Sequence, residues 1–214
     1  KPKNAEQVSS YAKRLASIPS DEIKIDYVDF QKDVHHEELI NNFHFYHNSN
    51  TVNSIFSLRL EWGIGNYENN KLSYAAGLCG MIGNESFSFN ELKEKLQKIG
   101  ATLDVFSSGN YTGINIKGFD SYFNQTMAIT GEFLRTMKVR KEDEKKLKKL
   151  IQGSIIERKF ESRESSAKGN ALKEYAIWGE NSDFLTRATV KEVKKMDSKI
   201  LMDQIEDAMA VETS

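Results

Sequence analysis

The alternation of apolar and polar side chains predicts a set of β-strands. Over residues 55–62 every second side chain is apolar, the set being Phe56, Leu58, Leu60 and Trp62. A period of two is typical of a strand that buries one face. The same alternation predicts strands over 23–30 and 42–47, and the latter should form a hairpin with 55–62 through a polar turn at 48–50. A second hairpin is predicted from residues 102–107 and 111–118.

A period near 3.6 residues predicts helices in most of the remaining chain. One apolar stripe of small side chains comprises Leu72, Ala75, Ala76, Cys79 and Ile82. Ser88 and Glu91 have the spacing of a capping box that begins a second helix, and Gly100 follows at the position where a left-handed residue ends it. Further helices are predicted over residues 122–137, 142–162, 167–178, 189–196 and 198–209.

This order of elements predicts an α+β fold. Strands joined by tight turns indicate an antiparallel β-sheet, and the runs of helices are expected to pack mainly on one face of it. Residues 1–22, which contain both prolines, are predicted to be a linker with a short helix. Residues 23–214 are predicted to form a single domain. We expect the chain to be a piece cut from a longer protein.

Composition and charge narrow the classes of function. The chain has 214 residues, enough to bury a core, and its 12 Phe, 8 Tyr and 2 Trp exclude an intrinsically disordered protein. A net charge of −1 offers no general basic field for nucleic acid or an anionic membrane. The single cysteine excludes a disulfide framework and a cysteine-rich zinc site. No apolar run approaches the ~18 residues that span a bilayer.

The reactive side chains taken alone predict no metal site. Residues 35–38 (HHEE) are interpreted as a solvated loop, in which neighbouring side chains point in different directions. His44 and His47 are three residues apart on a predicted strand and therefore lie on opposite faces. Cys79 lies on an apolar helix stripe and is expected to be a buried small side chain. The charged run 138–149 is expected to be a solvated helix face.

A longer pattern carries more information. Over residues 56–118 a strand ends in the Gly63-Ile64-Gly65 turn, two helices follow, the second ends in Gly100-Ala101, and a hairpin comes next. This arrangement resembles the first domain type of the M16 metallopeptidases, the insulinase, pitrilysin and mitochondrial processing peptidase family. Residues 175–196 are similar to a later segment of the same family. The resemblance extends over about residues 23–209 and implies the M16-like, or LuxS-like, α+β domain.

The resemblance also identifies where this chain departs from the family. At the family's zinc helix, which carries the motif H-x-x-E-H, Gly77 and Met81 stand in place of the two histidine ligands and Gly80 in place of the glutamate. Glu157, 76 residues after Met81, stands near the family's third ligand, either as a vestige of it or as an ordinary charged helix residue. Glycine supplies no ligand and a thioether binds zinc poorly, so this segment is expected to have no catalytic residue, no metal and no other cofactor. Gly77 and Gly80 are expected inside a regular helix packed on the sheet.

The function that the resemblance implies is that of a degenerate domain in a zinc protease. Such a domain, one of four, would line the substrate chamber and help to hold peptide for the catalytic half. Its partners would be that half of the same polypeptide, which holds the zinc, and the peptide substrate. Two alternatives stay open, a non-enzymatic core subunit of a larger complex and a peptide-binding module that uses a sheet edge. The resemblance to the family favours an exported bacterial protein. An H-x-x-E-H motif in the full-length product would distinguish the protease from the core subunit.

Overall fold

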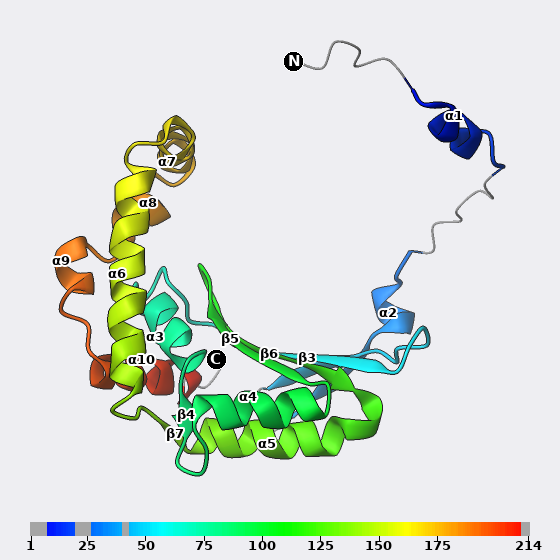
Figure 1. The fold of residues 1–214 in the computed structure, drawn as a ribbon, viewed down its shortest axis with the longest axis horizontal. Coiled ribbons are helices and arrows are strands. Elements are labelled where there is room, and N and C mark those ends of the chain that lie inside the picture. Colours follow the sequence, from blue (N-terminus) through cyan, green and yellow to red (C-terminus); the bar gives the residue numbers. More distant parts are fainter. Residues whose placement is uncertain (1–7, 20–26, 40–42, 211–214) are drawn as a thin grey trace. The chain divides into compact units, whose positions relative to one another are not determined.

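The computed structural model describes residues 8–19, 27–39 and 43–210. These fall into two compact units, which are considered separately. Unit 1 comprises Lys1–Glu37 and Tyr46–Asn48, and unit 2 comprises Glu38–Phe45 and Ser49–Ser214. Figure 1 traces the elements of both along the chain.

The described residues of unit 1 include two short helices. Helix α1 (Ser10–Ala16) begins where the Ser9 side chain accepts a hydrogen bond from the Ala12 amide, and none of its residues is buried. Helix α2 (Phe30–Asp33) is capped in the same way by Asp29. The strand predicted over 23–30 is wrong in its described part, because residues 27–29 have no regular structure and Phe30 begins α2. Residues 23–26 lie outside the described part of the chain. The predicted boundary between residues 22 and 23 stays a prediction.

A two-stranded sheet follows, formed by β1 (His35–Glu38) and β2 (His44–His47). Two sequence predictions are wrong here, because residues 35–38 form a strand instead of a loop, and β2 pairs with β1 instead of residues 55–62. Stacked rings explain the local pairing: the centroids of His35 and His47 lie 5.1 Å apart, and those of His36 and Tyr46 lie 4.5 Å apart. Such cross-strand pairs stabilise a short ladder.

Unit 2 is built on a three-stranded antiparallel sheet in the order β3 (Ile55–Trp62), β6 (Thr112–Phe119), β5 (Thr102–Ser107). The register places Ile114 of the central strand opposite Leu60 on one side and Val105 on the other. This alignment gathers the apolar side chains of all three strands on one face. The predicted hairpin of residues 102–107 and 111–118 is confirmed as β5 and β6.

Helices cover that apolar face, which confirms the predicted α+β class. They are α3 (Leu72–Cys79), α4 (Phe89–Lys98) and α5 (Phe123–Arg135), and α10 (Ser198–Ala210) packs against α3. Figure 1 shows α4 and α5 running side by side below the sheet. Ile114 and Ile116 are fully buried beneath them, whereas Arg59, Glu61 and Lys117 on the opposite face are exposed. The predicted capping box and the left-handed Gly100 (φ +64°) are both present at the ends of α4.

The C-terminal part of unit 2 is helical. The long helix α6 (Asp143–Glu161) is followed by α7 (Ser165–Trp178), α8 (Asp183–Thr186) and α9 (Val190–Val193). The pair β4 (Gly83–Asn84) and β7 (Met137–Lys138) forms a further antiparallel contact. Helix α8 and the two-residue strands were not predicted, because such short elements have no readable periodicity. Over the described residues, no helix combines the length and the apolarity needed to cross a membrane.

Candidate functional site

The candidate site lies where α3 packs against α6. Three contacts show how the two helices are aligned. Near the start of α3, the Tyr74 hydroxyl lies 2.8 Å from Ser154 Oγ. One turn later, a Cβ atom on Gly77 would lie 3.3 Å from Cδ2 of Leu150. Beyond the end of α3, Lys146 Nζ donates a hydrogen bond to the Met81 carbonyl at 2.8 Å. Residue numbers rise along α3 while they fall along α6, so the two helices run antiparallel.

This register fixes the surroundings of the predicted glycines. Gly77 lies inside α3 as expected, but it packs against Leu150 of α6 instead of the sheet. Gly80 is the C-cap residue and is exposed, so the expectation that it lies inside a regular helix is wrong. The reason is that α3 ends one residue earlier, at Cys79, before the Gly83–Asn84 strand begins. Neither glycine belongs to a loop before a helix N-terminus, the place where phosphates bind.

Glu157 lies at the other end of the helix pair. At 1.5 Å of rise per residue, it is about 10 Å further along α6 than Leu150 and about 16 Å further than Lys146. Its neighbours are Ser73 and Tyr74 at the start of α3. The structure therefore does not bring Glu157 together with Gly80 or Met81.

The donor atoms along this helix pair do not fit a zinc ion. The part of α3 that meets α6 offers a phenol at Tyr74, no side chain at Gly77 and the backbone carbonyl of Met81. A zinc site needs three or four imidazole, thiolate or carboxylate ligands. Among the described residues, no group of three or more His, Cys, Asp or Glu is arranged to hold a metal.

Cys79 is inert in its surroundings. It is 2% exposed, and burial, together with the charge of Glu206, raises the pKa of its thiol to about 12. A thiol that stays protonated is neither a good metal ligand nor a nucleophile. This agrees with its predicted role as a small buried side chain.

Arg158 and Tyr74 hold the site together. Arg158 Nη2 donates to the Tyr74 hydroxyl at 3.0 Å, and its Nη1 donates to the Ala188 carbonyl. Tyr74 therefore bonds to two residues of α6, and Arg158 ties α6 to the segment before α9. Sequence reasoning missed both residues, because a Tyr and an Arg 84 residues apart carry no spacing signal.

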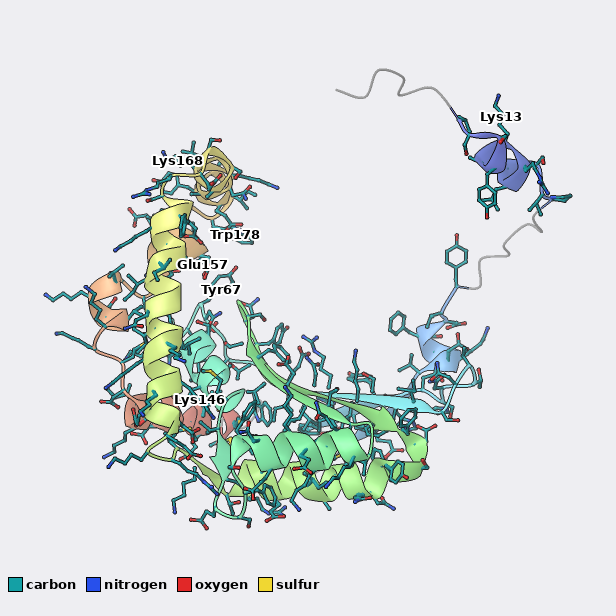
Figure 2. All side chains as sticks on the ribbon, viewed as in Figure 1. Lys13, Tyr67, Lys146, Glu157, Lys168 and Trp178 are labelled. Carbon is teal, nitrogen blue, oxygen red and sulfur yellow. The ribbon has the colours of Figure 1, made fainter. Side chains whose placement is uncertain are left out.

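A polar cleft opens beside this network. It consists of two adjoining hollows of about 480 and 220 Å³, which share Asn66, Glu161, Asp183 and Arg187. We call it the polar cleft. The turn at 108–109, the C-terminal half of α6, α7 and α8 also line it. Figure 2 labels Tyr67 and Glu157, which line its two parts.

The polar cleft carries an excess of negative charge. Its carboxylates are Glu157, Glu161, Glu174 and Asp183, against the guanidinium groups of Arg158 and Arg187. Arg187 is already bound, through a 2.7 Å ion pair to Glu161 and a position 4.4 Å from the centroid of Phe184. Four carboxylates and two guanidinium groups leave two negative charges uncompensated within the cleft. Such a surface favours basic and polar groups.

Helices α6, α7 and α8 also carry exposed apolar side chains. None of the 14 residues of α7 is buried, and Leu172 is 71% exposed. We call this set the apolar helix surface: Ile156, Phe160, Leu172, Tyr175, Ile177, Trp178, Phe184 and Leu185. A helix of this length is marginal without packing, and large exposed apolar side chains are typical of an interface.

Comparison with known proteins identifies the fold. No protein-family model matches the chain, and no curated protein matches it. Solved structures do match, among them an M16 peptidase inactive domain from Pseudomonas fluorescens, with a TM-score of 0.65 and 8% identity over 79% of this chain. The chain has the fold of an M16 peptidase domain. The resemblance inferred from residues 56–118 is thereby confirmed at the level of the fold.

Two further M16-fold matches are proteases. The periplasmic protease PqqL from Escherichia coli matches with a TM-score of 0.64 and 14% identity over 83% of this chain. The ferredoxin protease FusC, solved in complex with Arabidopsis ferredoxin, matches with a TM-score of 0.66 and 10% identity over 92%. The chain spans 42% of the Pseudomonas structure, 21% of PqqL and 24% of FusC. It thus corresponds to less than half the length of each.

Proposed function

We propose that this chain is a non-catalytic M16-type domain, one of four in a zinc peptidase, that lines the substrate chamber and helps to hold peptide for the catalytic half. The observation that carries the proposal is an M16 fold whose α3–α6 contact consists of Tyr74, Gly77 and Leu150 instead of metal ligands. The zinc of the parent protein would belong to its catalytic half.

The chemistry of these residues assigns a binding role. Hydrolysis at zinc needs three protein ligands, an open position for water and a base that accepts a proton from that water. Gly77, Gly80 and Met81 supply none of these groups. What such a domain can add is orientation, because fixing a peptide across the chamber removes translational and rotational freedom before the chemical step.

The polar cleft is the surface that we assign to the peptide. Outside the Arg187–Glu161 ion pair, three carboxylates, Glu157, Glu174 and Asp183, exceed the one remaining guanidinium group by two charges and favour lysine and arginine side chains. Asn66, Asn70 and Asn170 add amide groups that can bind a peptide backbone. A hollow of several hundred Å³ is large enough for one or two residues of an extended chain.

The apolar helix surface is the part that we assign to contact with an adjoining domain of the parent protein. This chain spans 42% of the matching structures from Pseudomonas fluorescens and Helicobacter pylori, so more than half of each of those chains lies outside the matched part. A neighbouring domain would bury Leu172, Ile177 and Trp178, each more than half exposed here. This contact would keep the polar cleft in a fixed place for the catalytic half.

The test compares cleavage of a long and a short peptide by the parent protein, by its catalytic half alone and by the two pieces mixed. We expect kcat/KM to fall more for the long peptide when this domain is missing, because only the long peptide reaches the polar cleft. Asp183→Asn should weaken cleavage of a long basic peptide about threefold, as expected for loss of one exposed charge pair. Asp203→Asn on α10, outside the cleft, is the matched control.

Two results would contradict the proposal. Full activity of the catalytic half alone on both peptides would exclude the chamber role. A full-length product without any H-x-x-E-H motif would instead favour the core-subunit alternative, since no catalytic half would exist for this domain to serve.

A further inference from the structure

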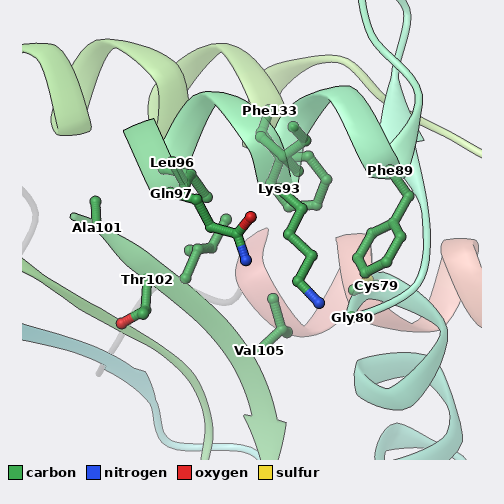
Figure 3. Close-up of a pocket in the computed structure, with 12 residues that line it drawn as sticks. Cys79, Gly80, Phe89, Lys93, Leu96, Gln97, Ala101, Thr102, Val105 and Phe133 are labelled. Atoms are coloured by element: carbon green, nitrogen blue, oxygen red, sulfur yellow. The ribbon is translucent and has the colours of Figure 1, made fainter. Parts of the chain in front are cut away.

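A second cavity lies away from the polar cleft and shares no residue with it. It measures about 200 Å³, is open to solvent on one side and is bordered by α4, the end of α3, α5 and β5 (Figure 3). We call it the α4 cavity. The proposed function assigns it no role.

The walls of the α4 cavity are apolar and mostly buried, with Phe89 and Leu103 half-buried. Phe133 and Cys79 form part of the interior and are 1% and 2% exposed. The remaining apolar lining consists of Phe89, Leu92, Leu96, Ala101, Leu103 and Val105. An apolar cavity of ~150 Å³ in another protein stays free of water and binds benzene. The α4 cavity is somewhat larger, so it has room for one aromatic ring with a short chain.

The mouth of the α4 cavity is polar and positively charged. Lys93 and Gln97 extend from α4 across the opening towards Gly80 and β5, as Figure 3 shows. Glu94 is paired with Lys98 at 2.8 Å and Asp143 with Lys146 at 2.7 Å, whereas the charge of Glu206 acts on Cys79 in the cavity wall. Lys93 takes part in none of the ion pairs found among the described residues.

This combination defines a class of ligand. Apolar walls reject a charged group, whereas an ammonium and an amide at the mouth attract a carboxylate. We propose that the α4 cavity binds a small monocarboxylate whose single aromatic ring or short alkyl chain enters the cavity. The ring packs against Phe133 and Cys79, and the carboxylate stays at the mouth beside Lys93 and Gln97. The same chemistry is found in a free acid and in a C-terminal phenylalanine of a peptide.

The experiment titrates the whole 214-residue chain with 3-phenylpropionate, followed by calorimetry and by methyl NMR. We expect saturable 1:1 binding that shifts the methyl signals of Leu92, Leu96, Leu103 and Val105 but not those of Val193 and Leu201. The neutral 3-phenylpropanol should bind about threefold more weakly, as for the loss of an exposed ion pair, and acetate should not bind. The tripeptide Gly-Gly-Phe and its C-terminal amide distinguish a peptide end from a free acid.

Two variants test the assignment of the residues. Lys93→Gln should weaken binding of 3-phenylpropionate about threefold and leave the affinity for 3-phenylpropanol unchanged. Lys199→Gln on α10 is the matched control and should change neither. Val105→Phe should fill the cavity and abolish binding, with circular dichroism to confirm that it is folded.

Three outcomes would overturn the inference. The first is the absence of saturable binding, and the second is a set of methyl shifts scattered over the whole domain. The third is equal affinity for the acid and the alcohol in both the wild-type chain and Lys93→Gln. Because the methyl signals report on the wild-type chain, the inference stays testable if Val105→Phe does not fold. None of these outcomes affects the chamber role, which depends on different residues.

Discussion

For single residues, backbone conformation or burial determines the effect of a substitution at a few positions. Gly100 ends α4 at φ +64°, a left-handed conformation that side chains with a Cβ atom adopt at a cost. Gly153 lies in the middle of α6 with open space around it. Cys79 is held protonated by its surroundings. Substitution should lower the free energy of unfolding at Gly100 and raise it at Gly153, and Cys79 should make it depend on pH.

Gly100→Ala should destabilise the protein by about 1 kcal/mol or more. The new Cβ would collide with the Phe119 ring and would be strained by the positive φ. Gly153→Ala is the matched control and should stabilise by about 0.5–1 kcal/mol, because alanine favours a helix interior. Urea unfolding of both variants measures the two effects. An equal change in both would show that conformation at residue 100 is not the cause.

Cys79 should make the free energy of unfolding depend on pH in the alkaline range. In the unfolded chain the thiol ionises near its ordinary pKa of ~8.5, but in the folded protein it stays protonated up to about 12. The stabilising contribution is therefore complete below pH ~8.5 and is lost as the pH rises towards 12. Relative to Cys79→Ala, the wild-type protein should lose about 2 kcal/mol between pH 7.5 and 10. An unchanged difference between the two proteins would contradict the raised pKa.

At the scale of the element, α4 carries its own beginning and end. The Ser88 side chain accepts from the Glu91 amide, while Glu91 Oε2 accepts from the Ser88 amide at 2.7 Å. The hydrogen bonds that the Ser88 amide and the Ser88 hydroxyl donate to Glu91 Oε2 lower the pKa of the Glu91 carboxyl, so its contribution to the cap is present above its ordinary pKa and is lost on acidification. The same arrangement at Thr189 and Glu192 begins α9. Helix ends are thus specified by residues three positions apart.

Ser88→Ala should destabilise the protein by about 1 kcal/mol, because one amide at the start of α4 loses its partner. Ser162→Ala at the C-cap of α6 removes another exposed serine and should change stability by less than about 0.5 kcal/mol. Thermal or urea unfolding of the pair measures the difference. Equal effects would mean that the cap is not what Ser88 contributes.

Gly77→Leu should destabilise the α3–α6 contact by about 1–3 kcal/mol, the range for an overpacked interior. Even a Cβ atom at Gly77 would lie 3.3 Å from Leu150, so a larger side chain has no room. Gly80→Leu is the matched control, since a Cβ there meets nothing nearer than 3.6 Å. Unfolding experiments should rank the two in that order. The reverse order would show that α3 does not pack on α6 through Gly77.

For the whole molecule, the fold is of the M16 type and consists of the sheet, the helices that cover it and α6. Its α3–α6 helix pair has no set of metal donors. Three surfaces remain for function: the polar cleft, the apolar helix surface and the α4 cavity. The α4 cavity shares no residue with the other two, whereas the polar cleft and the apolar helix surface lie on the same helices, α6, α7 and α8, and share Phe184. Substitutions that separate their roles can therefore be made within a single chain.

The purified chain should bind far less than one equivalent of zinc. The α3–α6 contact offers Tyr74, Gly77 and the Met81 carbonyl, which do not form a zinc site. Elemental analysis after dialysis without chelator measures this directly. Glu157→Gln should leave the zinc content unchanged, as should Glu85→Gln, an exposed control. About one equivalent of zinc that disappears in Glu157→Gln would identify Glu157 as a working ligand.

Elements whose signals are local could be predicted from the amino-acid sequence. The cap of α4, the left-handed Gly100, the β5–β6 hairpin and the stripe of α3 each depend on residues within a few positions of one another. The M16 resemblance and the α+β class follow from the order of such elements. Burial of Cys79 could be read from its place on the apolar stripe.

Which elements contact one another depends on the packing of the folded chain. The strand β2 pairs with β1 through stacked rings, and β3 pairs with β6, 50 to 64 residues away, because this pairing places the apolar side chains of the larger sheet on one face. Counting along the chain from Met81 reached Glu157, but the antiparallel register of α3 and α6 places Lys146 beside Met81 and Glu157 beside Tyr74. The polar cleft and the α4 cavity likewise join side chains from separate elements. Distance along the chain carries no information about such contacts, since packing alone sets them.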